Sequence, residues 1–183
     1  MASADVFIQA GHEGRISGAT GASGPLGKEI EWTPIVANEA KRVLEEAGVT
    51  VIREDADLDD IYDVTLAVYI HFDGAEPPDQ TGASVGYKGD SDQPAAEAWK
   101  ALYGKYWPFR WMSDNFTENL RQYYGFRNTR TTDAEFVIEL GEISSLEQAQ
   151  WLKPRLKWLG KLIAHFLSQR IGKGNVPDPG PFG

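Results

Sequence analysis

The stretch VFIQAGHEGR, residues 6–15, decides which fold this chain can adopt. An apolar run ends abruptly in Gly11-His12 and opens into a glycine-rich loop, which is typical of a buried strand that carries one histidine to the rim of a sheet. A second run of this kind, LAVYIH at residues 66–71, ends in His71. The chain has three histidines, and two of them therefore follow predicted strands, while His165 lies in a helical pattern near the C-terminus.

The segments around these strands predict an α/β fold. Apolar residues recur at helical spacing from Val36 to Ala47, Gly48 ends this helix, and residues 49–53 form the next strand. A strand, a helix and a strand in this order predict a right-handed crossover and a parallel sheet. Further strands are expected at residues 66–71, 83–87 and 135–140, mostly helical structure interrupted near Pro108 at 94–123, and a final helix at 154–171.

We predict a single domain over residues 1–171, with a mixed, mostly parallel sheet flanked by helices. Residues 172–183 are rich in glycine and proline, so we expect a flexible tail there. The glycine-rich loop at 11–27 lacks the Gly-Lys-Ser/Thr ending of a phosphate-binding loop. It is therefore expected to be a mobile loop beside a functional site.

The composition narrows the possible functions. The chain has 183 residues with 18 basic and 27 acidic side chains, and its formal net charge is −9. Nucleic acid is not an expected partner, because phosphate contacts need clustered lysines and arginines. The absence of cysteine excludes disulfides, thiolate metal sites and cysteine nucleophiles. No apolar run approaches the roughly 20 residues that span a bilayer, so no membrane insertion is expected, and no signal peptide is visible.

Three polar residues, His12, His71 and Glu139, follow or end predicted strands at the sheet edge where ligands of open α/β sheets bind. Two histidines and one glutamate form a known ligand set for catalytic zinc, with water in the fourth position. Glu29 and Glu31 both lie at or just before the start of the first predicted helix. A further carboxylate outside the metal shell can carry a proton from water to a leaving amine. Glu139 suits this role, because burial at the end of a strand raises a carboxyl pKa.

Each of these residues also has a structural interpretation. A strand-end histidine can be a packed structural residue, Glu29 can be a first-turn acid favoured by the helix dipole, and Glu139 can pair with Arg127 or Arg130. The two arginines can alternatively touch carboxylates of a substrate, although a surface loop is expected there. The segment GASVG at 82–86 matches a Gly-x-Ser-x-Gly nucleophile elbow, but the strand before it and the helix after it that an elbow needs are not predicted.

Four motifs of this chain resemble those of the zinc-dependent N-acetylmuramoyl-L-alanine amidases of the amidase-3 type. The first is the apolar strand followed by GHEG at residues 11–14, and the second is Glu29, three residues before Trp32, in a helix that Gly48 ends. The third is YIHFD at residues 69–73, and the fourth is FVIELGE at residues 136–142. The motifs occur in the family's order, and the resemblance covers nearly the whole chain.

The resemblance implies that His12, Glu29 and His71 hold one zinc ion and that Glu139 is the catalytic acid and base. The spacing of the second motif favours Glu29 over Glu31. The resemblance also implies hydrolysis of the amide between the lactyl group of N-acetylmuramic acid and the L-alanine of the stem peptide. Peptidoglycan is then the expected partner, and the protein is expected to be a monomer.

Some positions depart from the family's pattern. Gln9 stands where an aspartate is common, Glu142 stands where a phenylalanine is common, and Glu13 places a charge beside His12. None of these departures removes an implied metal ligand. They therefore bear on substrate preference more than on the chemistry.

The absence of a visible signal peptide favours a phage endolysin, made in the cytoplasm and acting on the cell wall or in the periplasm, with an excised catalytic domain as the alternative. A zinc peptidase that cuts within the stem peptide would use the same chemistry in a different pocket. A non-catalytic wall-binding module would need no zinc and would use Trp32, Trp107 and Trp111 as sugar-stacking surfaces, although large aromatic side chains more often pack in cores. His165 is assigned no role.

Overall fold

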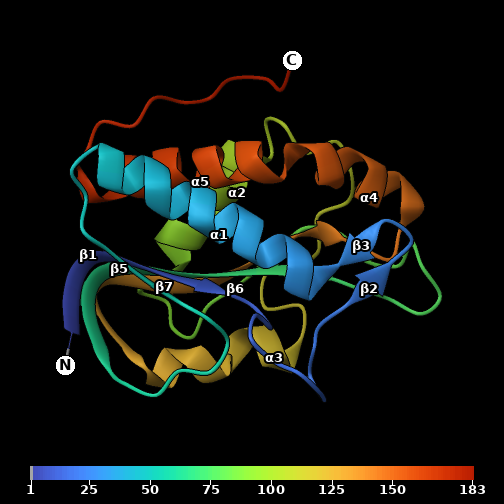
Figure 1. Ribbon diagram of the computed structural model, residues 1–183, viewed down its shortest axis with the longest axis horizontal. Helices are drawn as coiled ribbons and strands as arrows, with labels where there is room; N and C mark the ends of the chain where they lie inside the picture. The colour runs from blue at the N-terminus through green and yellow to red at the C-terminus, as the bar shows by residue number, and fades with distance from the viewer. Residues whose placement is uncertain (1) are drawn as a thin grey trace.

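A five-stranded sheet with the strand order β4-β1-β5-β7-β6 forms the centre of this computed structural model, which describes residues 2–183 (Figure 1). The strands are β1 (Ala2–Ala10), β4 (Val51–Glu54), β5 (Tyr62–Asp73), β6 (Ser84–Gly86) and β7 (Thr129–Glu142). The pairs of β1 with β4, β1 with β5 and β5 with β7 are parallel, and only β6 pairs antiparallel, with β7. The predicted mixed, mostly parallel sheet is therefore confirmed.

Helices cover the two faces of the sheet unequally. Figure 1 shows α1 (Glu29–Glu46), α2 (Gln93–Tyr103) and α5 (Leu156–Ile171) on one face, and the short α3 (Glu118–Arg121) with the single-turn η1 (Tyr124–Arg127) on the other. A large apolar core fills the first interface and a smaller one the second. Because both faces are covered, the central strands are apolar on both sides and do not alternate.

The remaining elements connect this framework. A small hairpin of β2 (Ser23–Gly24) and β3 (Gly27–Lys28) leads into α1, and α4 (Leu146–Leu152) with the turn η2 (Lys153–Arg155) leads into α5. The contact between α1 and α5 depends on Gly160, because a Cβ at this position would lie 2.6 Å from the carbonyl oxygen of Val36. The two helices therefore pack closely across the apolar core.

The start of α1 places both candidate glutamates. Glu29 is the first residue of the helix, and the Glu31 side chain accepts a hydrogen bond from the backbone N–H of Lys28 at 3.3 Å. The prediction that both glutamates lie at the helix start is confirmed. Pro34 lies inside the helix, in its second turn, although proline is usually tolerated only in the first. The helix gives up one internal hydrogen bond there.

The prediction of mostly helical structure at 94–123 is wrong. The helix α2 ends at Tyr103, and the following chain runs along the sheet edge, where an isolated bridge joins Trp111 to Ala83. Aromatic packing accounts for this path, because the ring of Trp107 lies 5.6 Å from that of Tyr103 and 5.2 Å from that of Trp151. These apolar side chains are buried by an irregular segment, so a helical face is not required.

The last residues lie along α5 without forming a helix or strand. Val176 is buried, its carbonyl oxygen lies 2.8 Å from Nδ1 of His165, and Trp158 Nε1 donates to the carbonyl of Gly180 at 2.9 Å. These contacts explain His165 as a structural residue. The boundary between 1–171 and 172–183 and the flexibility of the tail stay predictions. Within residues 2–183, no helix combines the length and apolarity needed to cross a bilayer.

Candidate metal site

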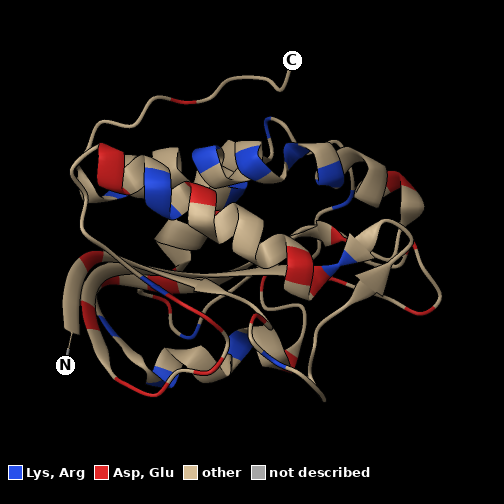
Figure 2. Ribbon diagram, in the orientation of Figure 1, with Lys and Arg blue, Asp and Glu red and all other residues tan. Residues whose placement is uncertain are grey.

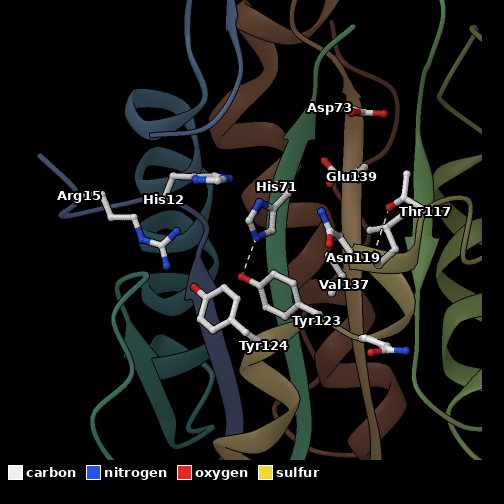
Figure 3. A pocket seen from close by; sticks show the side chains of 12 residues that line it. His12, Arg15, His71, Asp73, Thr117, Asn119, Tyr123, Tyr124, Val137 and Glu139 are labelled. Atoms are coloured by element: carbon white, nitrogen blue, oxygen red, sulfur yellow. Dashed lines mark hydrogen bonds between the residues drawn. The ribbon is translucent and has the colours of Figure 1, made fainter. Parts of the chain in front are cut away.

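Three predicted ligands meet at the carboxyl ends of β1 and β5. His12 follows β1, Glu29 opens α1 and His71 lies near the end of β5, and one ligand atom from each residue lies within 4.8 Å of the other two. The distance from Glu29 Oε1 to His71 Nδ1 is 2.8 Å, and that from Glu29 Oε1 to His12 Nε2 is 3.5 Å. Figure 3 shows both imidazole rings at the rim of one cavity.

The carboxylate of Glu29 is fixed at the centre of this group. Its side chain is buried, and its two oxygens accept hydrogen bonds from the backbone N–H groups of Ala22 at 2.8 Å and Phe72 at 3.1 Å. Burial alone would raise the pKa of Glu29, but its contacts with His71, His12 and the backbone N–H of Ala22 outweigh burial and lower it. Glu31, by contrast, is exposed and caps the helix, so only Glu29 has the position of a ligand.

Two glycines make room for the histidine rings. A Cβ at Gly11 would lie 2.3 Å from Cε1 of His71. A Cβ at Gly21 would lie 2.5 Å from Oε2 of Glu29 and 2.8 Å from Cδ2 of His12. The backbone of His12 itself has φ of 63°, in the left-handed region that is rare for residues other than glycine. The Gly-His pair is therefore needed for the close approach of the three side chains.

The hydrogen bond of His12 to the backbone fixes its tautomer. Nδ1 of His12 lies 2.6 Å from the carbonyl oxygen of Ala19, which can only accept, so the ring proton is on Nδ1 and donates to Ala19. Burial lowers the pKa of His12, and the neutral ring presents the lone pair of Nε2 to Glu29. Two acceptors face each other here, and a proton or a cation between them relieves the repulsion.

A chain of hydrogen bonds fixes the tautomer of His71 in the same way. The carbonyl of Ala56 accepts from Gln9 Nε2 at 3.3 Å, so Oε1 of the Gln9 amide faces Tyr123 and accepts from its hydroxyl. The Tyr123 oxygen, 2.8 Å from Nε2 of His71, is then left to accept the proton of that nitrogen. The lone pair of His71 Nδ1 consequently faces Glu29. Figure 3 shows the Tyr123 hydroxyl beneath the His71 ring.

These donors fit a divalent metal such as zinc. Two imidazole nitrogens and one carboxylate oxygen point their lone pairs toward one another. In these tautomers none of the three atoms carries a proton that it could donate to another. Histidine and glutamate are common ligands of zinc, which often has three protein ligands in catalytic sites. The hydrogen bonds of the outer ring nitrogens to a carbonyl and a hydroxyl are those that orient metal-binding histidines. The role of the three residues as ligands stays a prediction.

Glu139 lies beside this group on the neighbouring strand. It is paired in register with His71 across β5 and β7, and Figure 3 shows it next to His71 in the same cavity. Its Oε2 is buried and has no hydrogen-bond partner within residues 2–183. Burial, followed by the negative charges of Glu29 and Asp73, raises the pKa of Glu139 well above its usual value, as expected from its place on a buried strand.

The structure separates Glu139 from the arginines that could have paired with it. Arg130 lies opposite Asp63 in the β5–β7 register, whereas Glu139 lies opposite His71, at the other end of the pairing. Arg127 lies in η1 and lines a neighbouring groove. A structural ion pair with either arginine therefore does not explain this glutamate.

The cavity above the three ligands has a volume of about 450 Å³. Besides His12, His71 and Glu139, its wall includes Arg15, Asp73, Asn119, Tyr123 and Tyr124. Sequence reasoning did not single out Tyr123, because it lies in the segment that was expected to be helical. Gln9 departs from the family's pattern, and this departure is the signal in the sequence for the Gln9–Tyr123 contact.

Other candidate residues of the sequence have structural positions. Ser84 of the GASVG segment lies in β6, opposite Glu139 in register, and is fully buried, so a substrate cannot reach its hydroxyl in this structure. Trp32 and Trp107 are buried, and Trp111 is partly buried against the apolar core. These tryptophans therefore offer no open sugar-stacking platform.

Comparisons with known proteins identify the fold. No protein-family model and no curated protein sequence matches the chain. Among solved structures, the catalytic domain of CwlV, an N-acetylmuramoyl-L-alanine amidase from Bacillus (Paenibacillus) polymyxa var. colistinus, has a TM-score of 0.70 at 17% identity, covering 94% of this chain and 99% of that chain. The N-acetylmuramoyl-L-alanine amidase AmiC2 of Nostoc punctiforme has a TM-score of 0.69 at 18% identity, covering 94% and 98%.

A third similar structure is the catalytic domain of the CD27L endolysin targeting Clostridia difficile, with a TM-score of 0.68 at 13% identity, covering 91% of this chain and 97% of that chain. This chain therefore has the fold of N-acetylmuramoyl-L-alanine amidases over nearly its whole length. The fold expected from the four sequence motifs is confirmed.

Proposed function

We propose that this chain is a zinc-dependent N-acetylmuramoyl-L-alanine amidase, which hydrolyses the amide bond between N-acetylmuramic acid and L-alanine in peptidoglycan. One juxtaposition carries the proposal: three converging ligand atoms lie beside a buried glutamate, Glu139, whose Oε2 has no partner among the described residues. The fold shared with CwlV and AmiC2 supports the choice of substrate.

His12 Nε2, Glu29 Oε1 and His71 Nδ1 would hold the zinc ion. When bound, zinc supplies a Lewis acid that activates water and polarises the amide carbonyl. The surrounding chain keeps the ligands ready, since the backbone N–H groups of Ala22 and Phe72 hold the Glu29 carboxylate. The imidazole rings of His12 and His71 are already held in their orientation by hydrogen bonds before zinc binds. This preorganisation favours a high affinity for the metal.

Glu139 moves the proton in this mechanism. Its carboxylate takes a proton from the attacking water as the bond from oxygen to the lactyl carbonyl carbon forms. It then gives this proton to the nitrogen of L-alanine as the C–N bond breaks. Burial favours the protonated form of Glu139 and so holds the proton until the amine leaves. The products are a lactyl carboxylate and a stem peptide with a free amine.

We also propose that the protein is made in the cytoplasm and acts on the cell wall as a monomer. The fold shared with the CD27L endolysin catalytic domain supports an endolysin context. Light scattering on the purified protein tests the monomer: a mass of one chain is expected, and a stable dimer would contradict this part of the proposal.

The test of the activity is mass spectrometry of purified peptidoglycan after digestion. The protein is incubated with the wall as purified, after removal of metal by a chelator, and after zinc is restored. Stem peptides with a free L-alanine amine are expected in the first and third samples only. Peptides cut internally would instead identify a zinc peptidase. A metal-loaded protein that binds the wall without releasing peptides would identify a wall-binding module.

A further inference from the structure

A second groove lies directly beside the metal cavity. Its volume is about 580 Å³, and it is lined by Lys88, Arg121, Gln122, Tyr123, Phe126 and Arg127. Gln122 and Tyr123 also line the metal cavity, so the two hollows share a wall. The hydroxyl of Tyr123 touches His71, and the cationic groove therefore begins one side chain away from a candidate metal ligand.

The charge of this groove is opposite to that of the protein. The chain carries a formal net charge of −9, yet Lys88, Arg121 and Arg127 converge here and no acidic side chain lines the groove. All three cations are exposed, and none forms an ion pair with any side chain in the part of the chain that the structure describes. Arg127 Nε donates to the carbonyl of Tyr124 at 3.5 Å, which leaves the two terminal nitrogens of its guanidinium, together with Lys88 and Arg121, available to an anion.

The opposite side of the metal cavity is different. Arg15 lies 3.3 Å from the carboxylate of Asp57 and donates to the carbonyl of Ala19 at 3.5 Å, so its guanidinium is already occupied. Asp57 belongs to the acidic connection at 54–63, which Figure 2 shows as a mostly red loop, while blue segments lie along α3 and η1. A negatively charged part of a ligand that extends out of the metal cavity is therefore expected to lie on the side of α3 and η1.

We propose that the groove of Lys88, Arg121 and Arg127 binds the carboxylates of the stem peptide, next to the L-alanine whose amide is cut at the metal cavity. This inference rests on the proposed function. The residue after L-alanine in a stem peptide is a D-glutamate with a free or amidated α-carboxyl group. In an extended chain this α-carboxyl group lies roughly 7 Å from the nitrogen of L-alanine. The sugar rings of the glycan strand are uncharged and gain nothing from a cationic groove.

Recognition of this carboxylate would let the protein distinguish a stem peptide with a free D-glutamate α-carboxyl group from one in which the group is amidated. Arginine forms paired hydrogen bonds with a carboxylate that an amide cannot match. Because the groove is open to solvent, each contact is expected to be modest, and loss of both arginines should raise KM for the carboxylate substrate roughly three- to tenfold. The chemical step at Glu139 should not change, so kcat should stay the same.

The test uses two soluble muropeptides that differ only in the D-glutamate α-carboxyl group, free in one and amidated in the other. The zinc-loaded protein is compared with the double variant Arg121→Gln/Arg127→Gln. The unsubstituted protein should prefer the free carboxylate through KM. The variant should lose this preference, because its KM for the free carboxylate should rise to the level of its KM for the amidated substrate. The control, Lys157→Gln/Lys161→Gln, makes the same change of net charge on exposed positions of α5 and should keep the preference.

Several outcomes would overturn the inference. One is equal cleavage of both muropeptides by the unsubstituted protein, which would leave the amidase function intact. Another is an equal loss of preference in the α5 control, which would indicate long-range steering and no local site. A groove that binds poly(glycerol phosphate) more tightly than the stem peptide would identify a teichoic acid site. Failure to release L-alanine peptides from either muropeptide would overturn the proposed function itself.

Measurement of peptide binding in a catalytically impaired variant gives a second, independent test of the groove. In the Glu139→Gln variant, binding of the free tripeptide L-Ala-D-isoGlu-L-Lys can be measured by calorimetry at two salt concentrations. Binding that weakens with salt and with Arg121→Gln/Arg127→Gln is expected. Binding that is indifferent to both changes would contradict the groove even if the wall is cleaved.

Discussion

The hydroxyl oxygen of Tyr123 lies 2.8 Å from Nε2 of His71, on the opposite side of the ring from the Nδ1 that faces Glu29. This contact joins a candidate metal ligand to Gln9 and, through it, to the carbonyl of Ala56. The proton positions along this chain are determined by the carbonyl at its end, which can only accept. Tyr123 is therefore a positioning residue for His71, and it would act on a bound zinc ion without touching it.

Replacement of Tyr123 tests this relationship. In Tyr123→Phe, Nε2–H of His71 loses its acceptor, so zinc affinity should fall about 10- to 100-fold, the range found for outer-shell partners of metal ligands. Competition with a fluorescent zinc chelator measures this directly and does not depend on activity. Tyr124→Phe is the matched control, because Tyr124 bonds to Ala56 and Gln9 and leaves the His71 contact in place. Equal zinc affinity in the two variants would contradict the role of Tyr123.

The two glutamates at the start of α1 give a second prediction. Glu29→Gln should abolish stoichiometric zinc binding, because the carboxylate supplies both the negative charge and the oxygen at the centre of the site. Glu31→Gln keeps an oxygen that can accept from Lys28 N–H but removes a negative charge at the helix N-terminus, so a loss of about 0.3–1 kcal/mol in the free energy of unfolding is expected with no loss of zinc. Metal analysis after gel filtration distinguishes the two. The reverse result would move the ligand to Glu31.

Gly11 gives a prediction about packing. In Gly11→Ala the new methyl group would fall 2.3 Å from Cε1 of His71, so the ring must move or the strand must shift. Overpacking of this kind costs roughly 1–3 kcal/mol, and the displaced ring should also weaken zinc binding. Gly89→Ala is the control, because no atom lies closer than 3.7 Å to a Cβ there. Chemical unfolding with and without zinc measures both effects, and unchanged values for Gly11→Ala would refute this explanation of the Gly-His motif.

Glu135 predicts a pH dependence of stability. Burial raises its pKa from 4.5 to about 7, with Asp92 adding to the rise and Thr129 and Lys88 opposing it. Below pH 4.5 the carboxyl is protonated in both the folded and the unfolded chain. As the pH rises toward 7, the unfolded chain ionises first, so the free energy of unfolding falls, by at most about 3 kcal/mol.

The Glu135→Gln variant removes this contribution. The difference in the free energy of unfolding between variant and unsubstituted protein should grow in favour of the variant from pH 5 to pH 7.5 and then level off. Urea unfolding across this range measures it. A difference that is constant with pH would mean that Glu135 is ionised throughout.

The features that the sequence predicts are those that depend on the residues of one short segment. The strands that deliver His12 and His71 end in changes from apolar residues to glycine or polar residues, and the parallel pairing of β1 with β4 follows from the crossover through α1. The place of Glu29 also followed from local spacing. The β7 strand is longer than expected, because its polar start at Thr129 pairs with Tyr62 and shows no apolar run.

The unpredicted part depends on contacts between distant segments. Tyr123 is separated from His71 by 52 positions in the sequence and from Gln9 by 114 positions, so no local pattern predicts either contact. The irregular path after Tyr103 is likewise set by packing of aromatic rings from three segments. Such contacts require the folded arrangement, and the sequence offered only the unusual Gln9 as a hint.

The most direct test of the central claim is hydrolysis of a defined N-acetylmuramyl tripeptide in water enriched in the heavy oxygen isotope. The zinc-loaded protein should place one heavy oxygen atom in the lactyl carboxylate and release a tripeptide with a free, unlabelled L-alanine amine. Glu139→Gln, with zinc bound as before, should slow this reaction at least about 100-fold. Heavy oxygen in a carboxylate of the peptide, or full activity of Glu139→Gln, would contradict the account.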